Sequence, residues 1–203
     1  MSPAPHAQAP DSQARRRWLR GVALLTGAGW LRSAVAGIPA AYEAVIVEPR
    51  VTPAAGPGAA ASAAPAVWEF DLRPAQQRAR REGRRLYVYL GASDCPYCRR
   101  YEAFLAAHAG ELAPQFRAEK YLVVDLRSQL SVQARQLWLR SEQAQGAYAD
   151  FQRAIGDQRE RLLVYPSVWL LDAVSGRPLM QMPAGTGTFQ TVAEQLEILR
   201  LEQ

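Results

Sequence analysis

"LYVYLGASDCPYCRRYEAF", residues 86–104, contains the only two cysteines of the chain, Cys95 and Cys98. An apolar run typical of a buried strand precedes the pair, and a pattern typical of a helix follows it. Two cysteines three residues apart can form a redox pair that opens and closes a disulfide, half of a metal site, or a structural cross-link. The neighbouring residues favour the redox pair.

Cys95 is predicted to stand at the start of a helix over 95–110, because Pro96 suits the first helical position. The unpaired N–H groups and the positive end of the helix dipole stabilise a thiolate there. The thiolate is the attacking species in disulfide exchange. Cys98 lies one turn further along the same face, within reach of a disulfide. We therefore expect Cys95 to be the exposed attacking thiol and Cys98 the resolving thiol.

The metal interpretation lacks ligands. A structural zinc site takes four Cys or His ligands, and the only histidines of the chain are His6 and His108. His108 is predicted at the far end of the helix that Cys95 starts. A two-coordinate Cu(I) carrier that uses the same dithiolate stays open. As a cross-link the pair would remove little chain entropy, since its loop spans four residues. We expect a redox site without cofactor or metal.

The first 36 residues have the layout of an export signal, with a basic start, an apolar stretch and small residues at the cleavage positions Ala34 and Ala36. Its basic part resembles the twin-arginine signal, and we expect a periplasmic protein, in a compartment where disulfides persist. A basic disordered tail or a membrane anchor is the alternative. The residues that fit the twin-arginine pattern are Arg15, Arg16, Trp18, Leu19 and Arg20.

The net charge of +5 is concentrated in that segment, which holds five arginines and one aspartate. The remaining residues have 19 basic and 18 acidic side chains. Composition therefore gives no reason to expect a nucleic-acid partner. The next segment, 37–66, ends in a tract of Ala, Pro, Gly and Ser and is predicted to be a linker.

From Val67 onward, predicted strands alternate with predicted helices, which favours an α/β domain over 67–203. We expect a central mixed β-sheet flanked by helices. The predicted strands cover 85–92, 121–126, 161–172 and 177–182, of which the last two form a closing hairpin. The predicted helices cover 72–83, 95–110 and 188–201, and residues 128–160 are predicted to be a helical insertion.

A C-x-x-C in such a pattern is typical of a thioredoxin-like redox motif. From near Asp71 to its end, the chain resembles the thioredoxin superfamily: an apolar strand leads into "GASDCPYC", and the later "VYPSVWLLD" is similar to the family's cis-proline strand. The resemblance implies a thioredoxin-like fold, with the insertion before the cis-proline strand. It also implies a cis Tyr165–Pro166 bond beside the cysteines, where the backbone binds the substrate chain. An ordinary trans proline at an edge strand is the alternative.

The sequence departs from thioredoxin proper at two positions. Asp94 replaces the tryptophan before the first cysteine, and Tyr89 stands where thioredoxin has a buried carboxylate that assists proton transfer. The active-site dipeptide, Pro96-Tyr97, is the one found in glutaredoxins.

The resemblance implies a thiol-disulfide oxidoreductase whose partners are protein disulfides and thiols. Exported relatives of this layout are usually kept reduced by a membrane electron donor, so we expect a monomeric reductase. A disulfide-donating oxidase, a Cu(I) carrier, and an interaction protein that works through its insertion are the alternatives.

Overall fold

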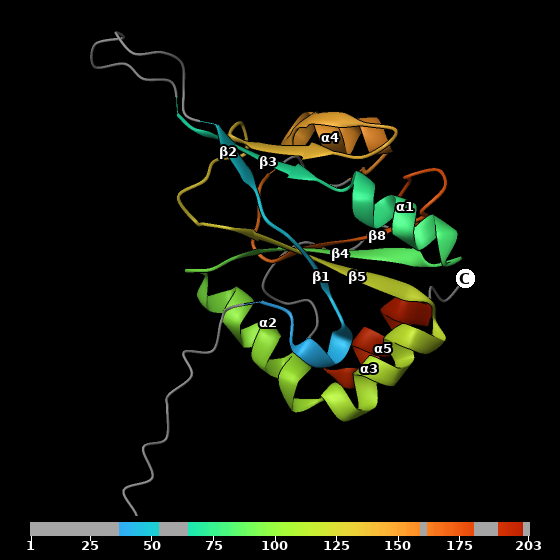
Figure 1. Cartoon of the computed structure of the whole chain (residues 1–203). Helices are drawn as coiled ribbons and strands as arrows, with labels where there is room; N and C mark the ends of the chain where they lie inside the picture. Colours follow the sequence, from blue (N-terminus) through green and yellow to red (C-terminus); the bar gives the residue numbers. More distant parts are fainter. Residues whose placement is uncertain (1–36, 53–64, 159–161, 181–190, 201–203) are drawn as a thin grey trace, which may run out of the picture. The chain divides into compact units, whose positions relative to one another are not determined.

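The computed structural model describes residues 37–52, 65–158, 162–180 and 191–200 (Figure 1). These residues form an α/β arrangement with two mixed four-stranded sheets, and the described part contains five α-helices. The predicted α/β class with a mixed sheet is confirmed, whereas the second sheet was not predicted. The predicted signal segment, 1–36, lies outside the described residues.

The first sheet has the strand order β1-β5-β4-β8. Its two central strands, β4 (Arg85–Ala92) and β5 (Tyr121–Ser128), run parallel along their whole length. Both are buried on both faces, which explains their nearly continuous apolar sequences. The shorter β8 (Ser167–Leu171) runs antiparallel to β4, and β1 (Val45–Val47) runs parallel to β5.

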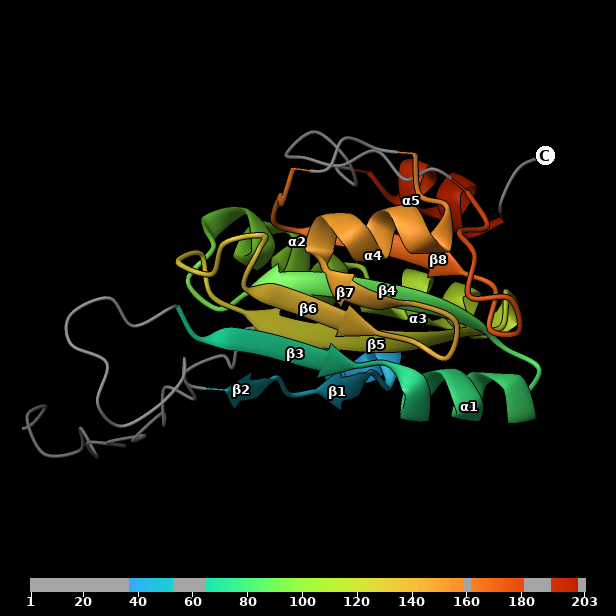
Figure 2. The ribbon, with the colours of Figure 1, turned by 90° about the horizontal axis from the view of Figure 1, so that it is seen from above.

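The second sheet has the order β2-β3-β6-β7. Together with two helices it covers one face of the first sheet, and three helices cover the other face (Figures 1 and 2). The second sheet consists of β2 (Arg50–Thr52), β3 (Val67–Asp71), β6 (Leu137–Arg140) and β7 (Gln145–Ala147); α1 (Arg73–Arg81) and α4 (Tyr148–Ile155) lie on the same side, and α2 (Pro96–Ala107), α3 (Ala109–Ala118) and α5 (Val192–Arg200) on the other.

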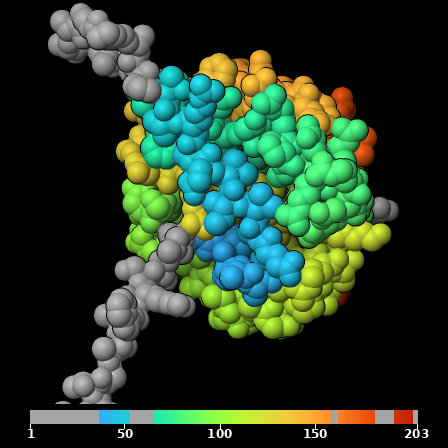
Figure 3. All heavy atoms as spheres, in the orientation of Figure 1, coloured from blue at the N-terminus to red at the C-terminus, as the bar shows by residue number. Residues whose placement is uncertain are grey.

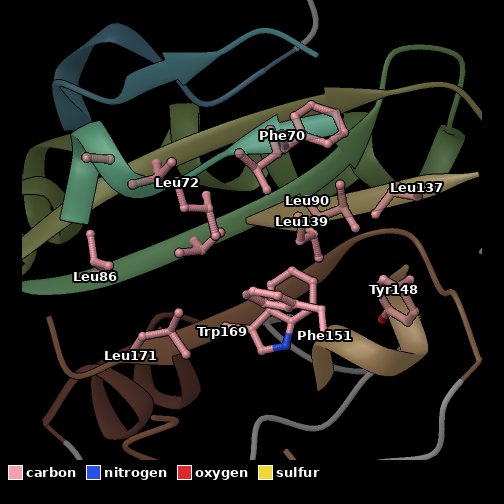
Figure 4. Packing of buried hydrophobic residues seen from close by; sticks show 14 of the residues in the cluster. Phe70, Leu72, Leu86, Leu90, Leu137, Leu139, Tyr148, Phe151, Trp169 and Leu171 are labelled. Carbon is pink, nitrogen blue, oxygen red and sulfur yellow. The ribbon is translucent and has the colours of Figure 1, made fainter. Parts of the chain in front are cut away.

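The larger core cluster lies between the two sheets (Figure 4). Alternate residues of β4 and β8 point into it and meet aromatic side chains of α4. Each fully buried large apolar side chain contributes about 1.5–3 kcal/mol to stability. The labelled members in Figure 4 are Phe70, Leu72, Leu86, Leu90, Leu137, Leu139, Tyr148, Phe151, Trp169 and Leu171.

Residues 37–52 belong to the fold, so the prediction of a linker beginning at residue 37 was wrong. They form the short 3₁₀ helix η2 (Ala40–Tyr42) and the strands β1 and β2. The Ile38 N–H donates to Asp125 Oδ2 at 3.0 Å, and the Tyr42 hydroxyl donates to the Leu105 carbonyl at 2.8 Å. Figure 3 shows the segment, in blue, lying along the surface of the folded unit. A segment too short for its own core is ordered here by the open edges of two sheets.

The region 128–160 is helical only in its last third, so the prediction of a helical insertion was wrong for its first part. Strand β6 pairs in parallel with β3, and β7 pairs with β6. Leu137 and Leu139 are buried, whereas Trp138 between them remains 41% exposed. This alternation of buried and exposed residues is that of a strand.

The predicted helix over 95–110 also differs from the structure. Helix α2 ends at Ala107 and is followed directly by α3, which the sequence did not predict.

We predict that Tyr42→Ala destabilises the protein by about 3–5 kcal/mol, as expected when a buried aromatic ring is removed. The variant loses the hydrogen bond to Leu105 and the edge-to-face contact with Phe116, whose ring centroid lies 5.1 Å away. Urea denaturation measures the change in the free energy of unfolding. Ile46→Ala is the control, since Ile46 is in the same segment but 49% exposed. Equal stability of the two variants would contradict the role given to residues 37–52.

Candidate functional site

Cys95 is the N-cap residue of α2, as the sequence predicts for the start of this helix. Its Sγ accepts a hydrogen bond from the Cys98 N–H at 3.2 Å. Its own N–H donates to the Ala92 carbonyl at 3.0 Å, which ties the cysteine to the end of β4. Pro96 occupies the first helical position, where no N–H is needed. The sulfur of Cys95 therefore lies where an anionic thiolate is stabilised by a backbone donor and by the helix dipole.

Cys98 lies one turn deeper and is fully buried. Its Sγ accepts a hydrogen bond from the Ala92 N–H at 3.4 Å. Burial, reinforced by the hydrogen bond with Cys95, raises the pKa of the Cys98 thiol to about 12, although the hydrogen bonds with Ala92 and Tyr89 act in the opposite direction. Both cysteines are free thiols in the structure. The sulfur of Cys98 is thus held in a buried position that favours its protonated form.

The loop before β8 brings the predicted substrate-binding residues to the cysteines. The Tyr165–Pro166 bond is cis, the geometry that the resemblance implies. The Tyr165 carbonyl lies 3.9 Å from Cys95 Sγ, and the Tyr165 hydroxyl donates to Ser128 Oγ at 3.0 Å. The residues singled out in the sequence, Cys95 and Cys98 on α2 and Tyr165 seventy positions later, therefore form one site.

A cavity of about 520 Å³ opens beside Cys95. Cys95 lines it but is only 1% exposed, so the prediction of an exposed thiol was wrong. The lining residues are Cys95, Pro96, Tyr97, Leu130, Val132, Gln133, Ala134, Leu163, Val164 and Tyr165.

The wall formed by residues 130–134 was missed by the sequence analysis. Asp94 holds this wall, since its Oδ1 accepts a hydrogen bond from the Leu130 N–H at 2.8 Å. Leu130 is 48% exposed and lines the cavity. The available signal was the pair of isolated apolar residues, Leu130 and Val132, in an otherwise polar stretch.

A buried carboxyl group was also missed. The Tyr89 hydroxyl donates to Glu102 Oε1 at 2.9 Å, and both residues are buried. Burial raises the pKa of Tyr89, and interactions with Cys98 and Glu102 add to the rise. Glu102 is four residues after Cys98 on α2, a spacing that puts two side chains on one helix face and could have indicated the proximity.

Two further observations concern metal ligands and membrane-spanning helices. In the described residues, no group of three or more His, Cys, Asp or Glu side chains could hold a metal ion. His108 is exposed at the junction of α2 and α3. No helix in the part of the chain that the structure describes is long and apolar enough to span a membrane.

Comparisons with protein-family models, with curated proteins and with solved structures returned no match to this chain. The chemistry of the site is therefore inferred from its geometry and from the sequence.

We predict that iodoacetamide at pH 8 alkylates Cys95 in the folded protein and leaves Cys98 unmodified. Cys95 lines the cavity whereas Cys98 is buried outside its lining, and the raised pKa of the Cys98 thiol keeps it protonated at that pH. Peptide mass spectrometry after a short reaction measures the labelled fraction of each cysteine. The unfolded protein in urea is the control, in which both cysteines should react. Equal labelling of the two in the folded protein would contradict the asymmetry.

Proposed function

We propose that this chain is a thiol-disulfide oxidoreductase with a thioredoxin-like fold, in which Cys95 attacks and Cys98 resolves. One observation carries the proposal: the Cys95 sulfur accepts the Cys98 N–H at the start of α2 and lines a cavity beside the Tyr165 carbonyl. This arrangement combines a stabilised nucleophile, a second thiol within reach, and space for a substrate at the nucleophile alone.

The reaction follows from the two sulfur environments. The Cys95 thiolate attacks a substrate disulfide, an S–S bond forms between Cys95 and one substrate sulfur, and the other substrate sulfur leaves as a thiolate. Cys98 then attacks Cys95 Sγ and loses its proton, and the Cys95–Cys98 disulfide forms while the second substrate sulfur leaves. The protein gives two electrons to the substrate, and the leaving thiolates take up protons.

The substrate class is suggested by the cavity. Its lining includes Leu130, Val132 and Leu163, and the backbone just before Pro166 places the Tyr165 carbonyl 3.9 Å from the Cys95 sulfur. An extended polypeptide can pair with such backbone by strand addition, and an apolar side chain beside its cysteine would fill the cavity. The preferred substrate is therefore a protein disulfide with an apolar neighbour.

The direction of electron flow is proposed from the sequence. A twin-arginine-type signal before residue 37 would deliver the protein to the periplasm, where disulfides persist and a reductase requires an electron supply. The proposal of a reductase therefore requires a partner. This partner would be a membrane electron-donor protein that reduces the Cys95–Cys98 disulfide.

The roles of the two cysteines predict an asymmetry in trapping. Cys98→Ala should accumulate a covalent mixed disulfide between Cys95 and a protein substrate, because the resolving thiol is missing. Cys95→Ala should accumulate none, since Cys98 is fully buried and, unlike Cys95, does not line the cavity. Non-reducing electrophoresis followed by mass spectrometry measures the trapped species, and the double variant is the background control. Equal trapping by the two single variants would refute the assigned roles.

The reduction potential of the pair predicts the direction of the reaction. Equilibration of the purified protein with glutathione or dithiothreitol should give a value below about −200 mV, as expected of a reductase that needs a donor. A value near −120 mV would instead indicate a disulfide donor. If no reversible disulfide forms, the oxidoreductase proposal fails, and binding of Cu(I) at one equivalent becomes the property to measure.

A further inference from the structure

The buried carboxyl group of Asp125 is incompletely paired. Its Oδ2 accepts hydrogen bonds from the Ile38 N–H at 3.0 Å and from Arg127 Nε at 3.0 Å, and a second guanidinium nitrogen of Arg127 lies 2.9 Å from the same oxygen. Its Oδ1 is also buried but has no hydrogen-bond partner in the part of the chain that the structure describes. A buried carboxylate oxygen without a donor is costly, so this site favours one more donor.

The charges around Asp125 leave room for a cation. Burial raises the pKa of this carboxyl group and the charge of Glu48 adds to the rise, while Arg127 and the Ile38 N–H act in the opposite direction. Two acidic side chains therefore face one guanidinium group. Tyr89, which lies opposite Asp125 in the register of β4 and β5, keeps its proton because burial raises its pKa. One added positive charge would balance the cluster.

The residue beside this carboxyl group is suited to a close approach. Gly37 precedes Ile38, whose nitrogen donates to Oδ2, so the Gly37 nitrogen is one residue away from the carboxyl group. The φ of Gly37 is +144°, which a side chain rarely permits, and a Cβ here would collide with the Arg127 guanidinium. Glycine therefore fits both the backbone conformation and the contact. Its freedom also allows the nitrogen to turn toward Oδ1.

Gly37 is also the residue that removal of the predicted export signal would leave at the start of the chain. The small residues Ala34 and Ala36 occupy the cleavage positions. Hydrolysis of the Ala36–Gly37 bond by a signal peptidase consumes one water and leaves a carboxylate on Ala36 and an α-amino group on Gly37. At pH 7 this amino group is mostly an ammonium ion with three N–H donors, since its ordinary pKa is about 7.7–8.0.

We propose that the α-ammonium group of a chain beginning at Gly37 binds the Asp125 carboxylate, so that removal of the export signal fastens residues 37–52 to the folded unit. The ammonium donates to Oδ1, and Ile38 and Arg127 keep their bonds to Oδ2. The segment lies along the surface (Figure 3) and adds β1 to the first sheet, so its first residue is a natural point of attachment. The inference goes beyond the proposed function, because it concerns maturation of the chain and uses neither cysteine.

The first measurement identifies the first residue of the mature chain. The full chain is expressed in a bacterium that has the twin-arginine pathway, and the protein is recovered from the periplasm. Its intact mass should be that of residues 37–203. A mature chain that begins at any other residue, or a protein that stays in the cytoplasm with residues 1–36 attached, overturns the inference.

The second measurement titrates the new amine. The sequence contains a single lysine, Lys120, which is exposed. The mature protein therefore has two amines, and Lys120 is the internal standard for Gly37. Trace labelling with acetic anhydride between pH 6 and 11, quantified by peptide mass spectrometry, gives the labelling midpoint of each amine in the folded protein and in urea.

Pairing with a carboxylate stabilises the charged amine and raises its pKa, whereas burial alone lowers it. The Gly37 midpoint should therefore lie at least one pH unit higher in the folded protein than in urea. Labelling of Gly37 at pH 7, relative to Lys120, should then be about tenfold slower in the folded protein. Steric cover alone would slow the labelling without raising the midpoint.

Asp125→Asn removes the charge but keeps an acceptor for the Ile38 N–H, so the Gly37 midpoint should fall to its value in urea. Glu102→Gln is the matched control, since Glu102 is a buried carboxyl group that bonds to Tyr89 instead. Its Gly37 midpoint should equal that of the wild type. Equal midpoints in the wild type and in Asp125→Asn overturn the inference.

Gly37→Ala serves if Asp125→Asn fails to fold. Its Cβ meets the Arg127 guanidinium and displaces the amine, while Asp125 stays in place. The midpoint of the Ala amine should be close to its value in urea, and a midpoint as high as that of the wild-type Gly37 amine overturns the inference. Cys95→Ala should show the wild-type midpoint for Gly37, so a failure of the proposed disulfide exchange leaves this result unchanged.

Discussion

The pairing of β4 with β5 on one side and β8 on the other is the constraint on which the site depends. The antiparallel register of β4 and β8 sets Leu90 opposite Ser167, so the end of β4 and the start of β8 lie together. Helix α2 begins directly after β4, and the Tyr165–Pro166 turn comes directly before β8. Cys95 and Tyr165 meet because their strands are neighbours, and both strands are anchored by side chains packed on two faces.

The cysteines also depend on the backbone of Ala92 at the end of this strand. Its carbonyl accepts the Cys95 N–H and its N–H donates to the Cys98 sulfur. One residue therefore holds both thiols at the separation and depth that make them unequal. An unequal pair suits sequential attack and resolution, because the first thiol must ionise readily and the second must wait for the mixed disulfide. The pKa of the Cys98 thiol is raised chiefly by its burial.

Much of this arrangement follows from local sequence patterns, and the rest depends on contacts between distant segments. The buried strands β4 and β5 were predicted because their apolar runs are long, and Pro96 marked the start of α2. Strands β1, β2, β6 and β7 have three or four residues each, and their order comes from pairing with partners that no local pattern reveals. The wall at Leu130 depends on one long-range hydrogen bond to Asp94. Glu102 was overlooked because nothing in a charged residue on a helix indicates that it will be buried.

The burial of Tyr89 and Glu102 is difficult to explain by stability alone. A buried polar pair loses its hydration, and well-packed apolar residues of similar volume are often at least as stabilising. Tyr87, on the same strand face, has its hydroxyl bonded within a cluster of tyrosines and reaches no carboxyl group. Tyr89 differs in one respect, which is that its hydroxyl donates to the buried carboxyl group of Glu102. A buried hydroxyl and a buried carboxyl group each need a hydrogen-bond partner, and the bond between Tyr89 and Glu102 supplies one to both.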